Sequence, residues 1–293
     1  MPEARLVKNV RENDALRSSF DALAQRVFGI SFEDWYLRGY WGEAYRPYVL
    51  AEGETVLAGA AANLMDLRWD GEVHRCIQIG TVMTAPEARG RGLSRRLLEE
   101  LLCDWAEDAE LVYLFANATA LGFYPKFGFQ RQAEQRCFVP APASRPEAVR
   151  RLNMDDPADR QLLWACALRG NPFSALSLWG GYELLMFHCT GPHRENVFYL
   201  PQAGAAVVAA QENGRLLCLD IFGGEGKRLE EVLAPLVRAT DREVGLGFTP
   251  LPDAAPRRRF EPVGEDDALF LLKGGLSPFG GGEPLLFPLL SHA

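Results

Sequence analysis

One short segment constrains the fold of this chain more than any other. Residues 84–102 read TAPEARGRGLSRRLLEELL: a proline turn, two arginines alternating with two glycines, and then leucines at helical spacing. The first amides of a helix have no partner within the helix, and its dipole favours an anion there. Gly90 and Gly92 allow the backbone to approach a phosphate closely, and Arg89 and Arg91 add charged donors. The segment therefore predicts a phosphate-binding turn between a strand and a helix.

Two better known phosphate loops do not fit the sequence. It contains no GxxxxGK[ST] segment of the kind that nucleoside triphosphatases use. It also lacks a GxGxxG segment followed by an acidic residue at the end of a second strand, so a dinucleotide site is poorly supported. An exposed Arg-Gly turn that happens to precede a helix remains the alternative for this segment taken alone.

The residues around the turn predict an alternation of strands and helices. Apolar residues at helical spacing predict a helix over residues 14–28, and a second helix follows the turn. Apolar runs separated by glycine-containing turns predict the strands. The expected strands cover residues 47–52, 55–65, 73–83, 111–116 and 129–138, with a further helix over about 118–126.

A proline-rich break then divides the chain. Residues 140–146, PAPASRP, hold three prolines and indicate a linker. We therefore expect a first domain over residues 1–139, a linker over 140–150 and a second domain over 151–293.

The second half repeats the order of the first without obvious sequence identity. Strands within 197–222, a helix over about 226–239 and a strand at REVGLGF give the order strand, turn, strand, helix, strand. This order predicts a diverged structural repeat. The tail after residue 273 is loop-like but apolar, so we expect it to pack against the rest of the protein.

Charge and composition exclude several functional classes. The net charge of −8 argues against a nucleic-acid partner, because phosphate neutralisation needs a basic surface. No apolar run is long enough to span a membrane, and the charged first residues do not form a secretory signal. The six cysteines are scattered without a CxxC pair, which is typical of reduced thiols in a cytoplasmic protein. His188, Cys189 and His193 are too few for a metal site and are expected to be structural.

Two motifs carry a resemblance to a known family. Residues 82–94, VMTAPEARGRGLS, resemble the acetyl-CoA motif of the GCN5-related N-acetyltransferases (GNAT), Arg/Gln-x-x-Gly-x-Gly/Ala. Here that motif is Arg89-x-x-Gly92-x-Ser94, with serine as a small replacement at the last position. Residues 117–129, NATALGFYPKFGF, are similar to the family's second segment, Asn-x-x-Ala-x-x-Phe-Tyr-x-x-x-Gly-Phe. The resemblance covers roughly residues 1–138.

The resemblance implies a fold and a cofactor. The fold class is α/β, with a central mixed sheet in which two parallel strands splay apart, followed by a second, degenerate GNAT-like domain. The pantetheine arm of acetyl-CoA would lie in the gap, with Asn117 beside it. Tyr124 would contact the cofactor and protonate the leaving thiolate, since a phenol is protonated at neutral pH. The edge of β-strand that would bind the arm comprises Val82, Met83 and Thr84, and the amides that would hold the pyrophosphate are those of Arg89, Gly90, Arg91, Gly92, Leu93 and Ser94.

The general base is not identified by these motifs. Some family members carry a glutamate on the strand before the phosphate turn, but here that strand offers only Gln78, which cannot act as a base. Asp66, His74 and Glu43 remain open. The chain also resembles, more distantly, the enhanced intracellular survival group, in which the terminal carboxylate reaches the active site. That resemblance implies a role for the Ala293 carboxylate or for His292, whereas a tail that only packs on the second domain is the alternative.

The acceptor is expected to be a primary amine of a small molecule or a peptide. Aromatic faces can bind a cation, and a carboxylate can supply the counter-charge. The residues expected to do so are Trp35, Tyr36, Tyr40, Trp41 and Glu43, although half of the aromatic residues could simply form core. In the second half, Gly223–Gly226 replaces the phosphate turn, and its Glu225 would repel phosphate, so we expect no cofactor there. A non-catalytic acetyl-CoA sensor and a homo-oligomer both remain open.

Overall fold

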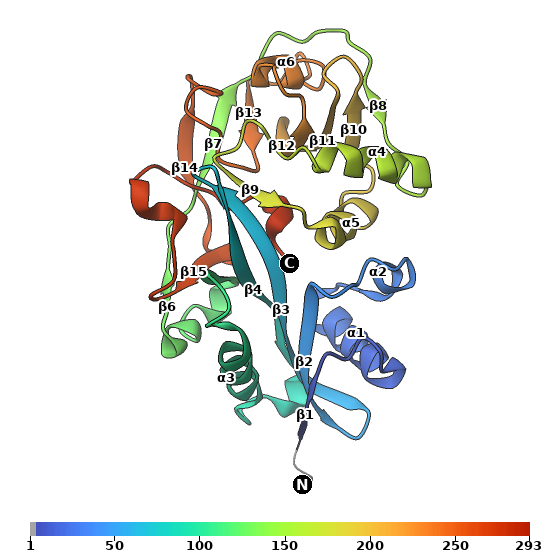
Figure 1. The fold of residues 1–293 in the computed structure, drawn as a ribbon, viewed down its shortest axis with the longest axis vertical. Helices are drawn as coiled ribbons and strands as arrows, with labels where there is room; N and C mark the ends of the chain where they lie inside the picture. Colours follow the sequence, from blue (N-terminus) through green and yellow to red (C-terminus); the bar gives the residue numbers. More distant parts are fainter. Residues whose placement is uncertain (1–3) are drawn as a thin grey trace.

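The computed structural model describes residues 4–293, which form two β-sheets stacked end to end (Figure 1). The first sheet is mixed, because β3 and β4 are antiparallel whereas β4 and β5 are parallel. Its strands in spatial order are β1 (Arg5–Lys8), β2 (Tyr45–Glu52), β3 (Thr55–Trp69), β4 (Glu72–Thr84), β5 (Leu111–Ala116), β15 (Ala268–Leu272) and β6 (Phe129–Arg131), and β9 (Leu176–Trp179) pairs with β3.

The second sheet repeats this plan, as the order of its elements predicted. β11 and β12 are antiparallel, and β12 and β13 are parallel, as are their counterparts in the first sheet. Its strands in spatial order are β14 (Arg259–Pro262), β7 (Gln135–Pro140), β13 (Glu243–Leu246), β12 (Arg215–Gly223), β11 (Ala205–Glu212), β10 (Val197–Leu200) and β8 (Arg150–Arg151). The expected mixed α/β fold with a second, GNAT-like sheet is therefore confirmed.

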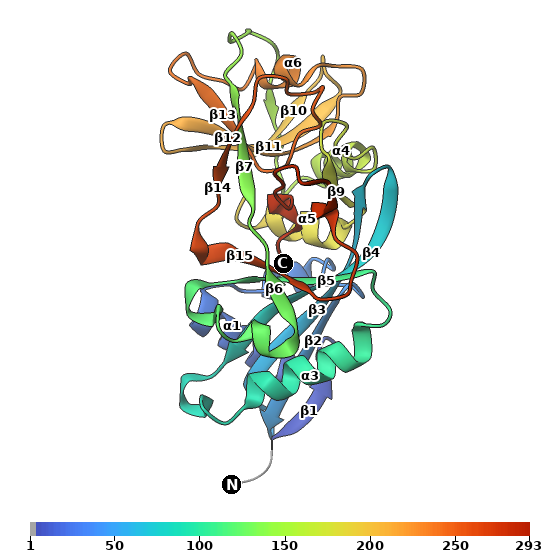
Figure 2. The same cartoon turned by 90° about the vertical axis from the view of Figure 1, so that its left-hand side faces the viewer.

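Each half of the chain contributes one or more strands to the sheet of the other half. β15, from the end of the chain, lies between β5 and β6 of the first sheet. β7, from the first half, lies between β13 and β14 of the second sheet. Figure 2 shows the chain running from β6 in one sheet directly into β7 in the other. The domain boundary between residues 139 and 140 therefore remains a prediction. Each sheet contains at least one strand that comes from the other half of the chain.

Helices cover both faces of the first sheet (Figure 1). α1 begins after Asn13, whose side chain accepts a hydrogen bond from the Leu16 amide, and ends at Gly29 in the left-handed region. α3 places its leucines against the sheet, with Leu97 and Leu98 fully buried. The α-helices are α1 (Asp14–Phe28), α2 (Glu33–Leu37), α3 (Leu93–Trp105), α4 (Pro157–Ala167), α5 (Tyr182–Thr190) and α6 (Leu229–Leu233).

Three elements differ from the sequence prediction. The helix expected over 118–126 is replaced by two 3₁₀ helices, η2 (Ala118–Ala120) and η3 (Tyr124–Phe127); Pro125 has no amide proton for an α-helical bond. The strand expected over 129–138 divides into β6 and β7, because the chain crosses between sheets there. The helix expected over 226–239 is only the five residues of α6.

The apolar tail packs between the two sheets, as its composition predicted. Its backbone is held by the second half, since the Leu286 amide donates to Thr249 Oγ1 at 2.7 Å and the Leu289 amide donates to the Gly247 carbonyl at 2.8 Å. The short helix η6 (Leu289–Ser291) follows, and Figure 1 shows the chain ending in the middle of the molecule. This course brings the C-terminus to the first sheet.

Glu134 gives this region a predicted pH dependence. Burial raises the pKa of Glu134 to about 7, although its carboxylate accepts a hydrogen bond from the Phe287 amide at 2.7 Å. The folded chain therefore binds this proton more tightly than the unfolded chain, and stability falls as pH rises from about 4.5 to about 7. Glutamine can accept the same hydrogen bond without a charge. In denaturant titrations, Glu134→Gln is expected to lose less stability than the parent between pH 5 and pH 8.

The matched control is Glu107→Gln, which changes an exposed carboxylate after α3. The stability of Glu107→Gln should change with pH as the stability of the parent does over the same range. An equal pH dependence for Glu134→Gln and the parent would contradict the assignment.

Candidate functional site

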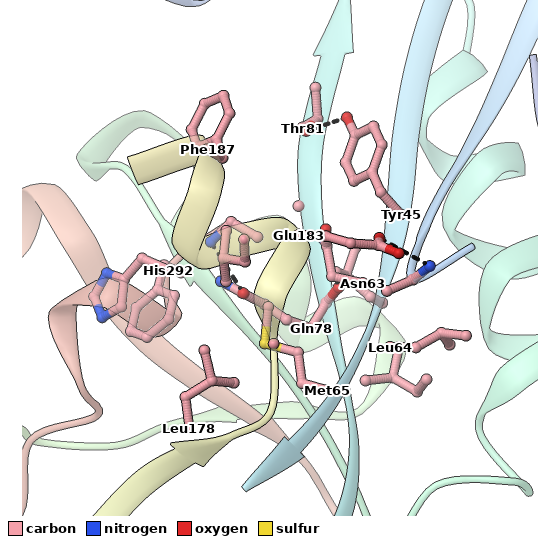
Figure 3. A pocket seen from close by; sticks show the side chains of 18 of the residues that line it. Tyr45, Asn63, Leu64, Met65, Gln78, Thr81, Leu178, Glu183, Phe187 and His292 are labelled. Carbon is pink, nitrogen blue, oxygen red and sulfur yellow. Dashed lines mark hydrogen bonds between the residues drawn. The ribbon is translucent and has the colours of Figure 1, made fainter. Parts of the chain in front are cut away.

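A cavity of about 1170 Å³ lies where the two halves meet (Figure 3). The first half supplies β3, β4 and the start of β2, and the second half supplies the turn before α5 and α5 itself. The last two residues of the chain also line it. The cavity is therefore built from both halves.

The sheet opens at this cavity because β4 and β5 stop pairing. Their parallel register ends at Ile79 and Leu114. Just beyond, β4 has one extra residue relative to β3, a β-bulge, and Thr81 adopts a φ of 52°. The Tyr45 hydroxyl lies 2.9 Å from Thr81 Oγ1 and fixes this turn of the strand. The edge of β4 after Gly80 consequently faces the opening without a β5 partner, as the splayed-strand fold predicts.

The phosphate turn follows β4 directly and begins α3. Gly90 and Gly92 have φ angles of 77° and 76°, in the left-handed region, and no heavy atom lies within 4 Å of the position of an added Cβ on either. Gly92 is the N-cap of α3, so the first amides of this 13-residue helix point toward the turn. Arg89 is exposed, whereas Arg91 pairs with Glu52 at 2.8 Å.

Ser94, which departs from the family motif, has a structural role. Its hydroxyl lies 2.6 Å from Thr84 Oγ1 and so joins the first turn of α3 to the end of β4. Neighbouring Leu93 and Met83 are buried. The serine therefore fits the turn without disturbing it.

Tyr124 and Asn117 reach the cavity from the far side of the opening. Tyr124 is 5% exposed at the start of η3, and burial raises the pKa of its phenol to about 12. It therefore remains protonated at neutral pH. Asn117 caps η2, with Oδ1 accepting from the Thr119 amide at 3.1 Å. With Val82, these two predicted residues line one cavity.

The C-terminus lies against β4. The Ala293 amide donates to Gln78 Oε1 at 3.1 Å, and the terminal residue lines the same cavity as Tyr124. The His292 ring also lines it, stacked on Phe115 with centroids 3.6 Å apart and with Nδ1 2.9 Å from Asp267 Oδ2. Both tail residues singled out in the sequence are therefore at the cavity.

The other base candidates are distributed differently. Asp66 lines the cavity. His74 stacks on Trp69 and lies 3.1 Å from Glu110, and Glu43 forms ion pairs with arginines on the surface. Neither His74 nor Glu43 is among the lining residues.

Of the five residues expected to bind the acceptor, Trp35 lines the cavity. The others are used elsewhere: Tyr36 packs under the Arg17 guanidinium, Tyr40 meets Tyr182 edge to face, and Trp41 stacks on Trp35 within the core. Glu43 is in the surface ion pairs described above. Of these five residues, only Trp35 lines the cavity. A role of the other four in acceptor binding remains a prediction that their positions do not support.

Several lining residues come from the second half and have no signal in the sequence. They include Trp164, Trp179, Glu183 and Phe187. Glu183 connects the halves: its carboxylate accepts from the Ala44 amide at 3.2 Å, and its carbonyl accepts from Trp35 Nε1 at 2.8 Å. Burial raises the pKa of this carboxyl group. These contacts depend on tertiary structure and cannot be read from local motifs.

In the second half, Arg169 lies against the loop at the position of the phosphate turn. Its guanidinium lies 3.3 Å from Glu225 and also donates to the Gly204 carbonyl. A Cβ on Gly223 would clash with this guanidinium. The expectation that this half binds no acetyl-CoA remains a prediction.

Residues 4–293 contain no cluster of three or more side chains suited to a metal ion. In the same range, no helix is long and apolar enough to cross a membrane.

Comparisons with known proteins find a family similarity in the first half. Residues 8–131 match the family model of an acetyltransferase (GNAT) domain. This range contains both motifs, the phosphate turn and the opening between β4 and β5. No curated protein matches the sequence.

Three solved structures share the fold of nearly the whole chain. A probable N-acyltransferase of unknown function from Enterococcus faecalis V583 is 14% identical, with a TM-score of 0.64 over 92% of this chain and 72% of that one. A GCN5-related N-acetyltransferase from Kribbella flavida is 20% identical, with a TM-score of 0.57 over 92% and 70%. Eis1 from Mycobacterium abscessus is 14% identical, with a TM-score of 0.56 over 91% and 72%. Residues 8–131 are therefore similar to a GNAT acetyltransferase domain, and nearly the whole chain shares the fold of these three proteins.

Proposed function

We propose that the chain is an acetyl-CoA-dependent N-acetyltransferase that acts on a primary amine of a small molecule or a peptide by direct attack. One observation carries the proposal: Tyr124, Asn117, Val82 and the terminal residue Ala293 line a single cavity where β4 and β5 separate. This arrangement supports a proton donor and a proton acceptor at the opening where a GNAT cofactor would bind. The acceptor amine would enter between Trp35 and the aromatic residues of the second half.

The residues present fit the cofactor. The free edge of Val82, Met83 and Thr84 would bind the pantetheine arm through backbone hydrogen bonds, with Asn117 opposite. The open space at Gly90 and Gly92 and the amides at the start of α3 suit a pyrophosphate. Arg89 would add a charged donor. When bound, acetyl-CoA supplies the thioester carbonyl that the amine attacks.

The chain's own groups then have two tasks. An attacking amine must lose a proton, and we assign this proton to the Ala293 carboxylate. As the new C–N bond forms and the C–S bond breaks, the sulfur needs a proton, and we assign its source to the Tyr124 hydroxyl. Burial raises the pKa of this phenol to about 12, so it is protonated at neutral pH and can donate a hydrogen bond to the sulfur as negative charge develops there.

Replacing Tyr124 with phenylalanine is therefore expected to lower kcat about 100-fold, which is the lower end of typical general-acid contributions. The affinity for acetyl-CoA should change little, because the ring remains packed against Phe129 and Phe270. The measurement is steady-state acetyl transfer with 2-phenylethylamine, spermidine and Nα-acetyl-lysine as probe amines, with acetyl-CoA binding measured by calorimetry.

Tyr199→Phe is the matched control, because Tyr199 is a half-buried tyrosine on β10 outside the cavity. Its turnover should equal that of the parent. Parent-level turnover in Tyr124→Phe would remove Tyr124 as the acid. Binding of acetyl-CoA without transfer to any amine would favour the alternative of a non-catalytic sensor.

A further inference from the structure

We propose that Gln78, His188 and Gly80 form a seat that holds the Ala293 carboxylate at the opening between β4 and β5, with Gln78 and His188 as positioning residues. This inference rests on the proposed function, because it concerns the carboxylate assigned there as the proton acceptor. Gln78 and Gly80 come from the first half and His188 from the second, so both halves would position the carboxylate.

A chain terminus needs such a device. The last residues of most domains are poorly ordered unless they are tied down, and a base must be held within hydrogen-bond reach of its proton. Here the Ser291 hydroxyl donates to the Pro288 carbonyl at 2.7 Å, and the His292 ring is held by Phe115 and Asp267. Ser291 is fully buried, whereas Ala293 is exposed to the cavity. The Ser291 and His292 contacts hold side chains, so the backbone of the last peptide bond is fixed by the groups that hydrogen-bond to it.

Gln78 fixes the amide side of that peptide bond. Its side chain is 1% exposed within β4, and Oε1 accepts the Ala293 N–H at 3.1 Å. The Gln78 carbonyl accepts from Asn63 Nδ2 on β3 at 3.1 Å, so the strand backbone at this point is itself held. The glutamine that the sequence excludes as a base thus supports a different carboxylate.

His188 fixes the carbonyl side from the opposite half. Its Nε2 lies 2.9 Å from the His292 carbonyl oxygen, and because that oxygen can only accept, Nε2 carries the proton. Burial lowers the pKa of His188 to about 3, so the ring is neutral at physiological pH. Its Nδ1 is buried without a hydrogen-bond partner among residues 4–293. The ring therefore acts as a fixed donor that brings no positive charge to the neighbouring carboxylate.

Gly80 provides the space in which the terminal oxygen lies. A Cβ at this position would be 2.7 Å from the Ala293 oxygen and 3.0 Å from Asn63 Nδ2. Gly80 does not have a positive φ, so its backbone conformation is open to any residue. The terminus can approach β4 this closely because residue 80 has no side chain. The substitution Gly80→Ala should therefore displace the carboxylate with little backbone strain.

The first test measures how firmly the terminus is held, without depending on catalysis. Carboxypeptidase releases Ala293 from the full-length protein, and the rate is followed by mass spectrometry. Gln78→Leu, His188→Leu and Gly80→Ala are each expected to speed this release about tenfold or more, because a lost hydrogen bond or a clash frees the terminus. His188→Gln, which retains an N–H donor, should lie between His188→Leu and the parent. Gly264→Ala and Gln211→Leu are the matched controls, since Gly264 has open space around it and Gln211 lies in the second sheet.

The second test links the seat to the reaction. Acetyl transfer is measured with whichever of 2-phenylethylamine, spermidine and Nα-acetyl-lysine the parent acetylates fastest. The seat variants should lower kcat about 10- to 100-fold, as expected for a displaced reacting group, with acetyl-CoA affinity unchanged. In a chain that lacks Ala293, the same substitutions should have no further effect on kcat, because the group they position is gone.

The outcomes separate this inference from the proposed function. Unchanged release of Ala293 in all three variants overturns the seat, whatever the activity. Faster release with unchanged kcat, in a protein whose kcat does fall on removal of Ala293, also overturns it as a positioning device. If removal of Ala293 leaves kcat unchanged, the proposed base is wrong, and the release rates still report on the seat.

Discussion

Replacement of Gly92 by glutamate is expected to abolish acetyl-CoA binding in a folded protein. Gly92 has a φ of 76° at the N-cap of α3, where a side chain costs roughly 1–2 kcal/mol of strain. The added carboxylate would also lie at the end of the helix that favours an anion, in the place where we expect the pyrophosphate. Two anions at one helix end repel each other, so calorimetric titration should give no detectable heat of binding.

The control for this variant is Gly214→Glu. Gly214 has the same φ of 76° and equally open surroundings, but it lies in the turn between β11 and β12 of the second half. It should lose similar stability and retain parent affinity. If Gly92→Glu binds acetyl-CoA as tightly as this control does, the phosphate turn is wrongly assigned.

A fragment that ends at residue 139 is expected to remain unfolded, although it contains the whole range that matches the GNAT family model. In the intact protein β15 pairs with both β5 and β6, so its removal leaves two strand edges without partners. β7 would also lose β13 and β14. The fragment should show no cooperative transition in thermal or denaturant unfolding.

The matched experiment cuts the same linker without removing any strand. A protease site placed at the exposed residues 143–146 would allow the intact protein to be cleaved after it has folded. The two pieces should elute together and unfold in one transition, because each sheet retains the strand supplied by the other piece. A stable, cooperatively folded fragment 1–139 would contradict this account of the strand exchange.

Local features of the sequence predict the parts of the candidate site that are themselves local. The phosphate turn needs a strand, left-handed glycines and a helix start in direct succession, and all three can be read within residues 84–102. Tyr124 and Asn117 lie in one short motif of fixed spacing, so their common approach to the cavity could be predicted as well. The apolar tail was expected to pack because free apolar residues are costly in water.

Features that depend on distant segments could not be predicted in this way. Nothing in the short apolar run of β15 indicates that it joins the sheet of the other half, because a strand of this length fits either sheet. Glu183 and His188 reach the cavity and the C-terminus only because α5 packs across the first half. The aromatic residues before β2 could serve the core or the cavity, and the structure places Trp41 in the core and Trp35 at the cavity.

Calorimetric titration of the full chain with acetyl-CoA tests the central claim most directly. The cofactor site proposed here lies in the first half only, since the corresponding loop of the second half carries Glu225, which would repel phosphate. We predict saturable binding with a ratio of about one acetyl-CoA per chain. No binding by the folded protein would contradict the proposed transferase, and a ratio of about two would contradict the assignment of the second half as a domain without a cofactor.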